Sequence, residues 1–121
     1  MGFFKRLFRL PAVFLVTLWA RRAYDQGVKA AEERRKRERT IVYLAPNTFR
    51  PDRLVTYTRE TFRVQKKVFG YKARLLTMNT LRNGCYYHTA DKYGNHPMTR
   101  RERDVRRSAF VRERLRLARL T

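Results

Sequence analysis

The pattern of apolar and charged positions divides the chain into three segments, at 1–40, 41–97 and 98–121. The first segment begins with FFKRLFRL, which places apolar residues on one face of a helix and basic residues on the other. A charge-free run follows at 10–20, and strong helix formers continue beyond it. We therefore predict an N-terminal helical arm over 1–40, in which Pro11 either kinks the helix or starts a second one.

The middle segment, 41–97, has the pattern of a small extended or β region. IVYLA and RLVTYT are β-prone runs, each next to turn residues. TFRVQKKVF fits a strand by alternation and fits a helix through Phe62, Gln65 and Phe69, so both structures stay open across 53–81. Asn83-Gly84 is the signal of a type I′ turn, and we expect a hairpin at 83–84 that pairs LLTMNTL with CYYHTA.

The third segment, 98–121, has the pattern of a basic helix. Thr99 and Glu102 have capping-box spacing at its start. A loose apolar stripe follows, made of Val105, Ala109, Val111, Leu115, Ala118 and Leu120. The three segments together predict a small, extended α+β fold with an N-terminal helix or helices, a short hairpin-like middle and a long C-terminal helix.

Composition adds a constraint on partners. The 121 residues carry a formal net charge of +20, with 30 Lys or Arg against 10 Asp or Glu, and 23 of the basic residues are Arg. The excess is spread over all three segments, and a polyanionic partner would relieve the self-repulsion. Arginine binds phosphate bidentately and stacks on bases, so its excess favours nucleic acid over simple adhesion to a membrane.

Candidate chemistry for catalysis or metal binding is scarce. Cys85 is the only cysteine, so a disulfide scaffold is excluded. With His88 and His96 it gives three soft ligands, whereas structural zinc usually needs four. No motif of nucleophilic, metal-dependent or phosphate-loop chemistry occurs. We expect no enzyme activity, catalytic residue, metal site, cofactor or small-molecule substrate.

Three basic clusters are candidates for RNA contact: the EERRKRER run, the middle stretch in which basic and aromatic residues alternate, and the C-terminal helix. The first and the last also fit a solvated surface, because the pairs Glu32–Lys36, Glu33–Arg37, Glu102–Arg106 and Glu113–Arg116 have helical spacing. The middle stretch also fits strands with a core on one side and solubilising charge on the other. The candidate RNA-binding residues are Arg34, Arg35, Arg37, Arg39, Arg63, Lys66, Lys67, Arg100, Arg101, Arg103, Arg106, Arg107, Arg112 and Arg114.

The first 24 residues carry five basic groups and no acid. An amphipathic, acid-free start resembles a mitochondrial targeting segment. The charge-free run at 10–20 is shorter than the ~20 residues of a typical membrane span, although flanking arginines could snorkel. Residues 1–24 could therefore be embedded in a membrane, docked on protein or docked on RNA.

In its short length, arginine excess, lone cysteine, acid-free start and terminal helices around a small extended middle, the chain resembles mitochondrial ribosomal proteins as a class. The resemblance covers composition and layout. It implies a structural subunit in the mitochondrial matrix, bound to rRNA and to neighbouring ribosomal proteins. The alternative is a small accessory subunit of a mitochondrial inner-membrane complex, such as a respiratory complex or ATP synthase, with membrane contact through Leu10–Ala20.

Overall fold

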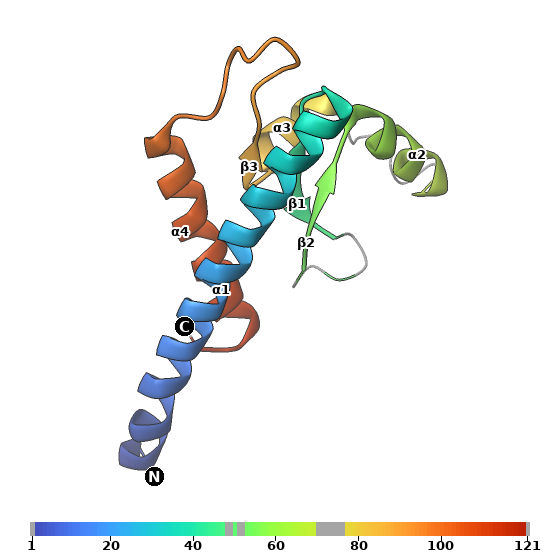
Figure 1. Ribbon diagram of the computed structural model, residues 1–121. Helices are drawn as coiled ribbons and strands as arrows, with labels where there is room; N and C mark the ends of the chain where they lie inside the picture. The colour runs from blue at the N-terminus through green and yellow to red at the C-terminus, as the bar shows by residue number, and fades with distance from the viewer. Residues whose placement is uncertain (1, 48–49, 51–52, 70–76, 121) are drawn as a thin grey trace.

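The computed structural model describes residues 2–47, 50, 53–69 and 77–120, with the backbone alone for 2–9, 68 and 69. The elements in chain order are α1 (Gly2–Glu38), β1 (Tyr43–Pro46), β2 (Leu54–Tyr57), α2 (Arg59–Phe69), α3 (Met78–Gly84), β3 (Tyr87–His88) and α4 (Arg100–Leu117). Helices surround a small antiparallel sheet, and α1 runs along the whole molecule as its longest element (Figure 1). The predicted α+β class, with N-terminal and C-terminal helices, is confirmed.

The N-terminal arm is one continuous helix that includes Pro11. No second helix starts at the proline. Gly27 also lies inside α1, where a Cβ atom would come within 2.8 Å of the Leu44 side chain. The glycine therefore lets α1 approach β1 closely, which accounts for a poor helix former in this position. Of the amphipathic face predicted for 3–10, only Leu10 has a described side chain, and it is exposed.

The sheet has the strand order β2-β1-β3, with Tyr43 opposite both Tyr57 and His88. Its central strand is covered on both faces. Val42 and Leu44 belong to a buried cluster with α1 and α4, whereas Tyr43 and Ala45 belong to a second cluster with α3. Side chains alternate between the faces of a strand, so burial of both faces explains why IVYLA is apolar at every position.

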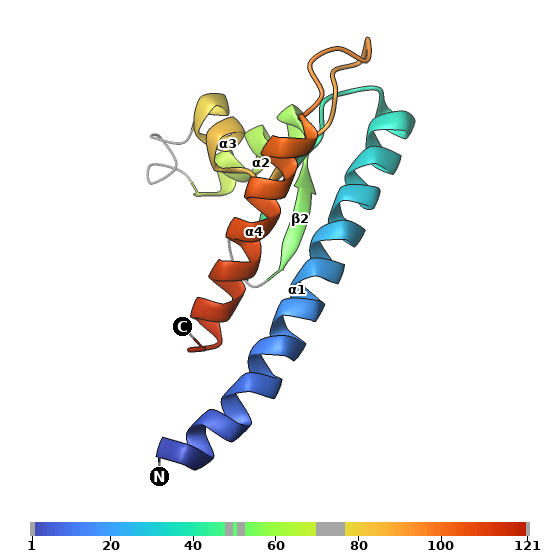
Figure 2. The same cartoon turned by 90° about the vertical axis from the view of Figure 1, so that its left-hand side faces the viewer.

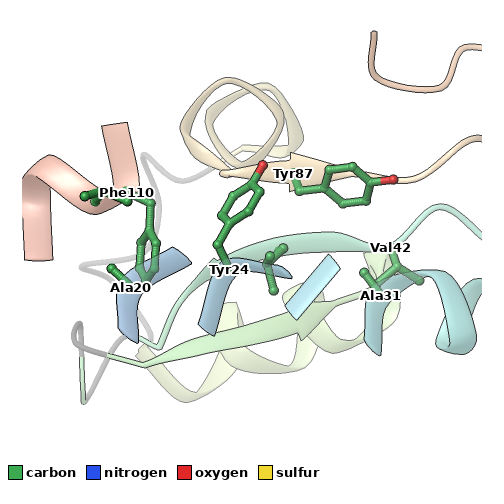
Figure 3. Packing of buried hydrophobic residues seen from close by; sticks show 8 residues of the cluster. Ala20, Tyr24, Ala31, Val42, Tyr87 and Phe110 are labelled. Atoms are coloured by element: carbon green, nitrogen blue, oxygen red, sulfur yellow. The ribbon is translucent and has the colours of Figure 1, made fainter. Parts of the chain in front are cut away.

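The core between α1, α4 and the sheet contains three buried aromatic residues, Tyr24, Tyr87 and Phe110 (Figure 3). The rings of Tyr24 and Phe110 have centroids 6.1 Å apart, and Tyr86 meets Phe110 edge-on at 5.3 Å. The Tyr24 hydroxyl donates a hydrogen bond to the Tyr86 carbonyl at 2.7 Å. Burial raises the pKa of Tyr24 to about 12. Tyr24 thus joins α1 to the chain beside β3 through packing and a hydrogen bond.

The open stretch at 61–69 is helical, within α2. Thr58 and Thr61 cap its start reciprocally: the Thr58 amide donates to Thr61 Oγ1 at 2.7 Å, and the Thr61 amide donates to Thr58 Oγ1 at 3.3 Å. Phe62 packs against the second cluster while Val64 stays 62% exposed. The half-buried residues of this stretch therefore lie on one face of a helix and do not alternate as they would in a strand.

The predicted hairpin at 83–84 is wrong. Asn83 and Gly84 are the last residues of α3, and among the described residues neither has the positive φ of a type I′ turn. Thr77 and Thr80 form a capping box at the start of α3, and the Cys85 amide closes its end on the Leu81 carbonyl. These local bonds stabilise a helix where the Asn-Gly pair alone indicates a turn. Residues 75–76 of the expected partner strand lie outside the described residues.

The C-terminal helix begins at its predicted cap, because Thr99 Oγ1 accepts a hydrogen bond from the Glu102 amide at 3.2 Å. The predicted apolar stripe is only partly buried. Phe110 and Val111 are the buried residues of α4, whereas Val105 is 60% exposed. Figure 2 shows α4 running alongside α1, and Phe110 and Val111 are the residues by which α4 joins the buried cluster with α1.

Candidate nucleic-acid interface

Four of the candidate arginines hold the fold together. Arg34 Nη1 donates to the Thr56 carbonyl of β2 at 2.8 Å, and the side chain also pairs with Glu38. Arg35 donates from Nη2 to the Asp91 carbonyl at 2.9 Å and from Nε to the Ala90 carbonyl at 3.1 Å. The end of α1 is thereby fastened to β2 and to the loop that follows β3.

The other two, Arg106 and Arg107, lie on α4 and are half-buried. Arg106 Nη1 donates to the Cys85 carbonyl, at the end of α3. Arg107 Nη2 pairs with Asp25 Oδ2 of α1 at 2.7 Å, and its Nε is buried with no hydrogen-bond partner among the described residues. Both guanidiniums connect elements that are distant in the sequence.

Most of the other candidate residues are exposed to solvent and lack partners. Their side chains form no hydrogen bond or ion pair with another described residue. The exposed set is Arg37, Arg39, Arg63, Lys67, Arg100, Arg101, Arg103 and Arg112, while Lys66 and Arg114 are half-buried. Exposed cations that form no ion pair with a described carboxylate are suited to an external anion, because no internal ion pair competes for them.

The acidic residues do not form most of the pairs that helical spacing suggests. Of the four suggested pairs, only Glu113–Arg116 forms in the described part of the chain, and the Arg116 guanidinium lowers the pKa of Glu113. Glu32 instead accepts a hydrogen bond from the Tyr87 hydroxyl. A tertiary contact thus replaces helical pairing at Glu32, and Lys36 and Arg37 are exposed.

A hollow of about 450 Å³ opens where the end of α1, the start of α2, α3 and the loop after β3 meet. It is lined by Arg39, Thr40, Ile41, Tyr43, Arg59, Met78, Arg82, Asp91, Lys92 and Tyr93. Of the four cationic residues in the described part of its lining, only Arg39 is among the sequence candidates. Arg59, Arg82 and Lys92 come from separate elements, so no local pattern could have brought them together.

The loop that forms one wall of this hollow is ordered by local bonds. Asp91 Oδ1 accepts from the amides of Tyr93 at 2.9 Å and Asn95 at 2.8 Å, and Gly94 supplies the positive φ of 81° that the turn requires. Arg35 Nη2 also donates a hydrogen bond to the Asp91 carbonyl, which ties the loop to α1. Lys92 and Tyr93 are thereby placed at the rim, with Lys92 Nζ 4.9 Å from the centre of the Tyr93 ring.

A second exposed surface lies on α1 before it reaches the core. This apolar surface consists of Leu10, Phe14, Leu15, Leu18 and Trp19, with Leu10 at 73% and Phe14 at 67% exposure. Figure 2 shows this part of α1 extending past the end of α4. None of the helices in the described part of the chain has the apolar length that crossing a bilayer requires.

Cys85 and the histidines form no metal cluster within the described residues. Cys85 is buried, and its thiol donates to the Arg82 carbonyl at 3.2 Å. Burial raises the pKa of this thiol, which disfavours the thiolate that a nucleophile or metal ligand would need.

Comparison with known proteins finds no matching family model, curated protein or solved structure.

Proposed function

We propose that the protein is a non-catalytic structural constituent of a ribosome, which binds rRNA through its exposed arginines and works in the mitochondrial matrix. The observation that carries this proposal is the division of its arginines into two sets. One set is used up in internal bonds, whereas a larger set is exposed and has no described acidic partner. A surface that merely keeps a protein soluble would usually mix both signs of charge.

The mechanism is electrostatic. Arg100, Arg101, Arg103 and Arg112 are exposed along α4, and Arg37, Arg39 and Arg63 extend the basic surface to α1 and α2. Each guanidinium that meets a phosphate releases condensed counterions, so affinity should fall steeply with salt. Contacts with phosphate carry little sequence information, and the protein should bridge RNA segments by position and not by base recognition.

Neighbouring ribosomal proteins are the second partner class in this proposal. The apolar surface of Leu10, Phe14, Leu15, Leu18 and Trp19 is what a protein neighbour could cover. Large apolar residues clustered on one stretch of helix mark an interaction site more often than scattered single residues do.

The same apolar surface favours one alternative, an accessory subunit of a mitochondrial inner-membrane complex. In that case Leu10–Ala20 would contact lipid and the flanking Arg21 and Arg22 would reach anionic headgroups.

Fractionation of the cells that make the protein separates the two proposals. Sedimentation of the full chain through a sucrose gradient should show co-migration with ribosomal particles, and ribonuclease should abolish it. Retention in the membrane pellet after carbonate extraction, with no ribonuclease-sensitive fraction, would instead support the membrane complex.

A further inference from the structure

The hollow beside α3 combines positive charge with an apolar floor. Arg39, Arg59, Arg82 and Lys92 surround it, all exposed. Among the described lining residues the one carboxylate is Asp91, whose Oδ1 accepts hydrogen bonds from two backbone amides. The floor contains Tyr43, which is 3% exposed, and the half-buried Ile41 and Met78. An anionic group at the rim and a flat, apolar group at the floor would both find complementary surroundings.

The size and shape of the hollow restrict the ligand further. Its volume, about 450 Å³, is within the range of small-ligand sites. A duplex is too wide to enter such a concavity, and its bases are stacked and paired inside the helix, where the hollow cannot reach them. A base that is flipped out of a single strand can enter, with its phosphate left at the mouth.

We propose that this hollow binds one unstacked nucleotide of a single-stranded RNA segment, with the phosphate on Arg59, Arg82 and Lys92 and the base on the floor. The proposal rests on the proposed RNA-binding function and gives it a specific site. Tyr93, 76% exposed at the rim, presents a ring on which the flanking base can stack. The exposed arginines of α4 neutralise phosphates on an open surface, whereas this hollow recognises a single nucleotide.

The site is preorganised by residues beneath it. Arg35 fixes the loop that carries Lys92 and Tyr93, and the Thr58–Thr61 cap fixes the start of α2, where Arg59 lies. Arg82 lies in the last turn of α3, whose end is held by the Cys85 amide. A preformed site pays less ordering entropy on binding, so a single nucleotide should bind measurably without the rest of the strand.

The test is a titration of the full-length protein with adenosine 5′-monophosphate, followed by NMR of the Ile41 and Met78 methyl groups. Saturable one-to-one shifts of these methyls are expected. The double variant R59A/R82A should weaken the affinity about tenfold, because it removes two charge-assisted contacts. The matched double variant R100A/R101A, which loses the same charge from exposed helix positions outside the hollow, should weaken it less than about twofold.

Several results would overturn the inference. One is that R59A/R82A and R100A/R101A weaken binding equally, since that means diffuse attraction. Another is that ribose 5-phosphate binds as tightly as the nucleotide, since the base would then contribute nothing. Circular dichroism of each variant confirms that the fold is kept.

The sedimentation experiment tests the proposed function separately. Ribonuclease-sensitive association without nucleotide-induced shifts at Ile41 and Met78 overturns this inference and leaves the proposed function intact. Saturable binding of the nucleotide without association with RNA supports the site and overturns the proposed function.

Discussion

The two halves of α1 differ in which side chains they bury, because the small residues are packed and the large apolar ones are exposed. The half from Ala20 to Glu38 packs on the sheet and α4 through Ala20, Tyr24, Gly27 and Ala31, of which three are the smallest residue types. The half before it carries the larger apolar residues, and they stay exposed, with Trp19 at 61%. Figure 1 shows the first half projecting from the body of the molecule.

In this chain, the face of α1 that packs inside the molecule carries small residues, which allow close approach of the helix. Large apolar residues lie elsewhere on α1. Small residues let α1 come near β1 and α4, so that Leu44 and Phe110 can fill the space. Large apolar residues without cover mark the surface left for another molecule.

Replacing Gly27 by Val should have the largest effect. The added atoms meet the Leu44 methyl groups, 2.8 and 2.9 Å from the position of a Cβ, and Leu44 is fully buried. We expect a loss of about 3 kcal/mol in the free energy of unfolding, measured by urea denaturation. Phe14→Ser, in the exposed half, should change it by less than about 0.5 kcal/mol. Equal losses in the two variants would mean that the exposed half is packed as well.

Arg35→Ala should cost about 2 kcal/mol, because it removes the charged donor that holds the Ala90 and Asp91 carbonyls. Arg37→Ala is the matched control, two residues further along the same helix and exposed without a described partner. Its unfolding free energy should stay within about 0.5 kcal/mol of the parent value. A stable Arg35→Ala protein would show that this guanidinium is available for RNA after all.

Tyr24→Phe should cost about 1 kcal/mol at neutral pH through loss of the bond to the Tyr86 carbonyl. The free energy of unfolding of this variant should also fall less steeply as the pH rises above 10. The pKa of Tyr24 rises from 10.0 to about 12 on folding, so its contribution is present below pH 10 and is lost as the pH rises towards 12.

The measurement is unfolding free energy against pH, with Tyr93→Phe as the exposed control. Burial also raises the pKa values of Tyr86 and Tyr87, so part of the alkaline loss should remain in Tyr24→Phe. An unchanged slope between pH 10 and 12 in that variant would contradict the buried position of Tyr24.

Gly84→Ala should have the smallest effect, within about 0.5 kcal/mol, because a Cβ there meets no atom within 4 Å and the residue is helical. Gly94→Ala should cost about 1 kcal/mol or more, since that residue has a φ of 81°. Thermal unfolding of both variants tests directly whether residues 83–84 end a helix or form a hairpin turn. A larger loss for Gly84→Ala would restore the hairpin at 83–84.

Patterns that depend on neighbours in the sequence predicted the fold well. IVYLA became the central strand because apolar residues at every position suit a strand buried on both faces, and Thr99 capped α4 because its hydroxyl needs only the amide three residues on. Asn83-Gly84 misled because Thr77, six residues earlier, had already started a helix. The ambiguity at 61–69 needed the packing of Phe62 to resolve it.

The candidate site was less predictable for a physical reason. An arginine that binds Cys85 and one that faces solvent look alike in the sequence, so Arg106 and Arg101 could not be separated. The hollow depends on Arg59, Arg82 and Lys92 meeting across three elements, which requires the tertiary structure. The charge count favours a polyanionic partner, which stays a prediction, and it does not indicate where on the fold such a partner would bind.

The salt dependence of RNA binding tests the central claim most directly. The affinity of the full chain for a fluorescently labelled RNA stem-loop is measured over a series of salt concentrations, for the parent protein and for a variant with Arg100, Arg101, Arg103 and Arg112 all changed to Ala. These side chains make no bond to another described residue, so the fold should survive. We predict that the slope of log affinity against log salt becomes shallower by about 3 in the variant. An unchanged slope, with the parent protein binding tightly, would contradict phosphate neutralisation by the exposed arginines of α4.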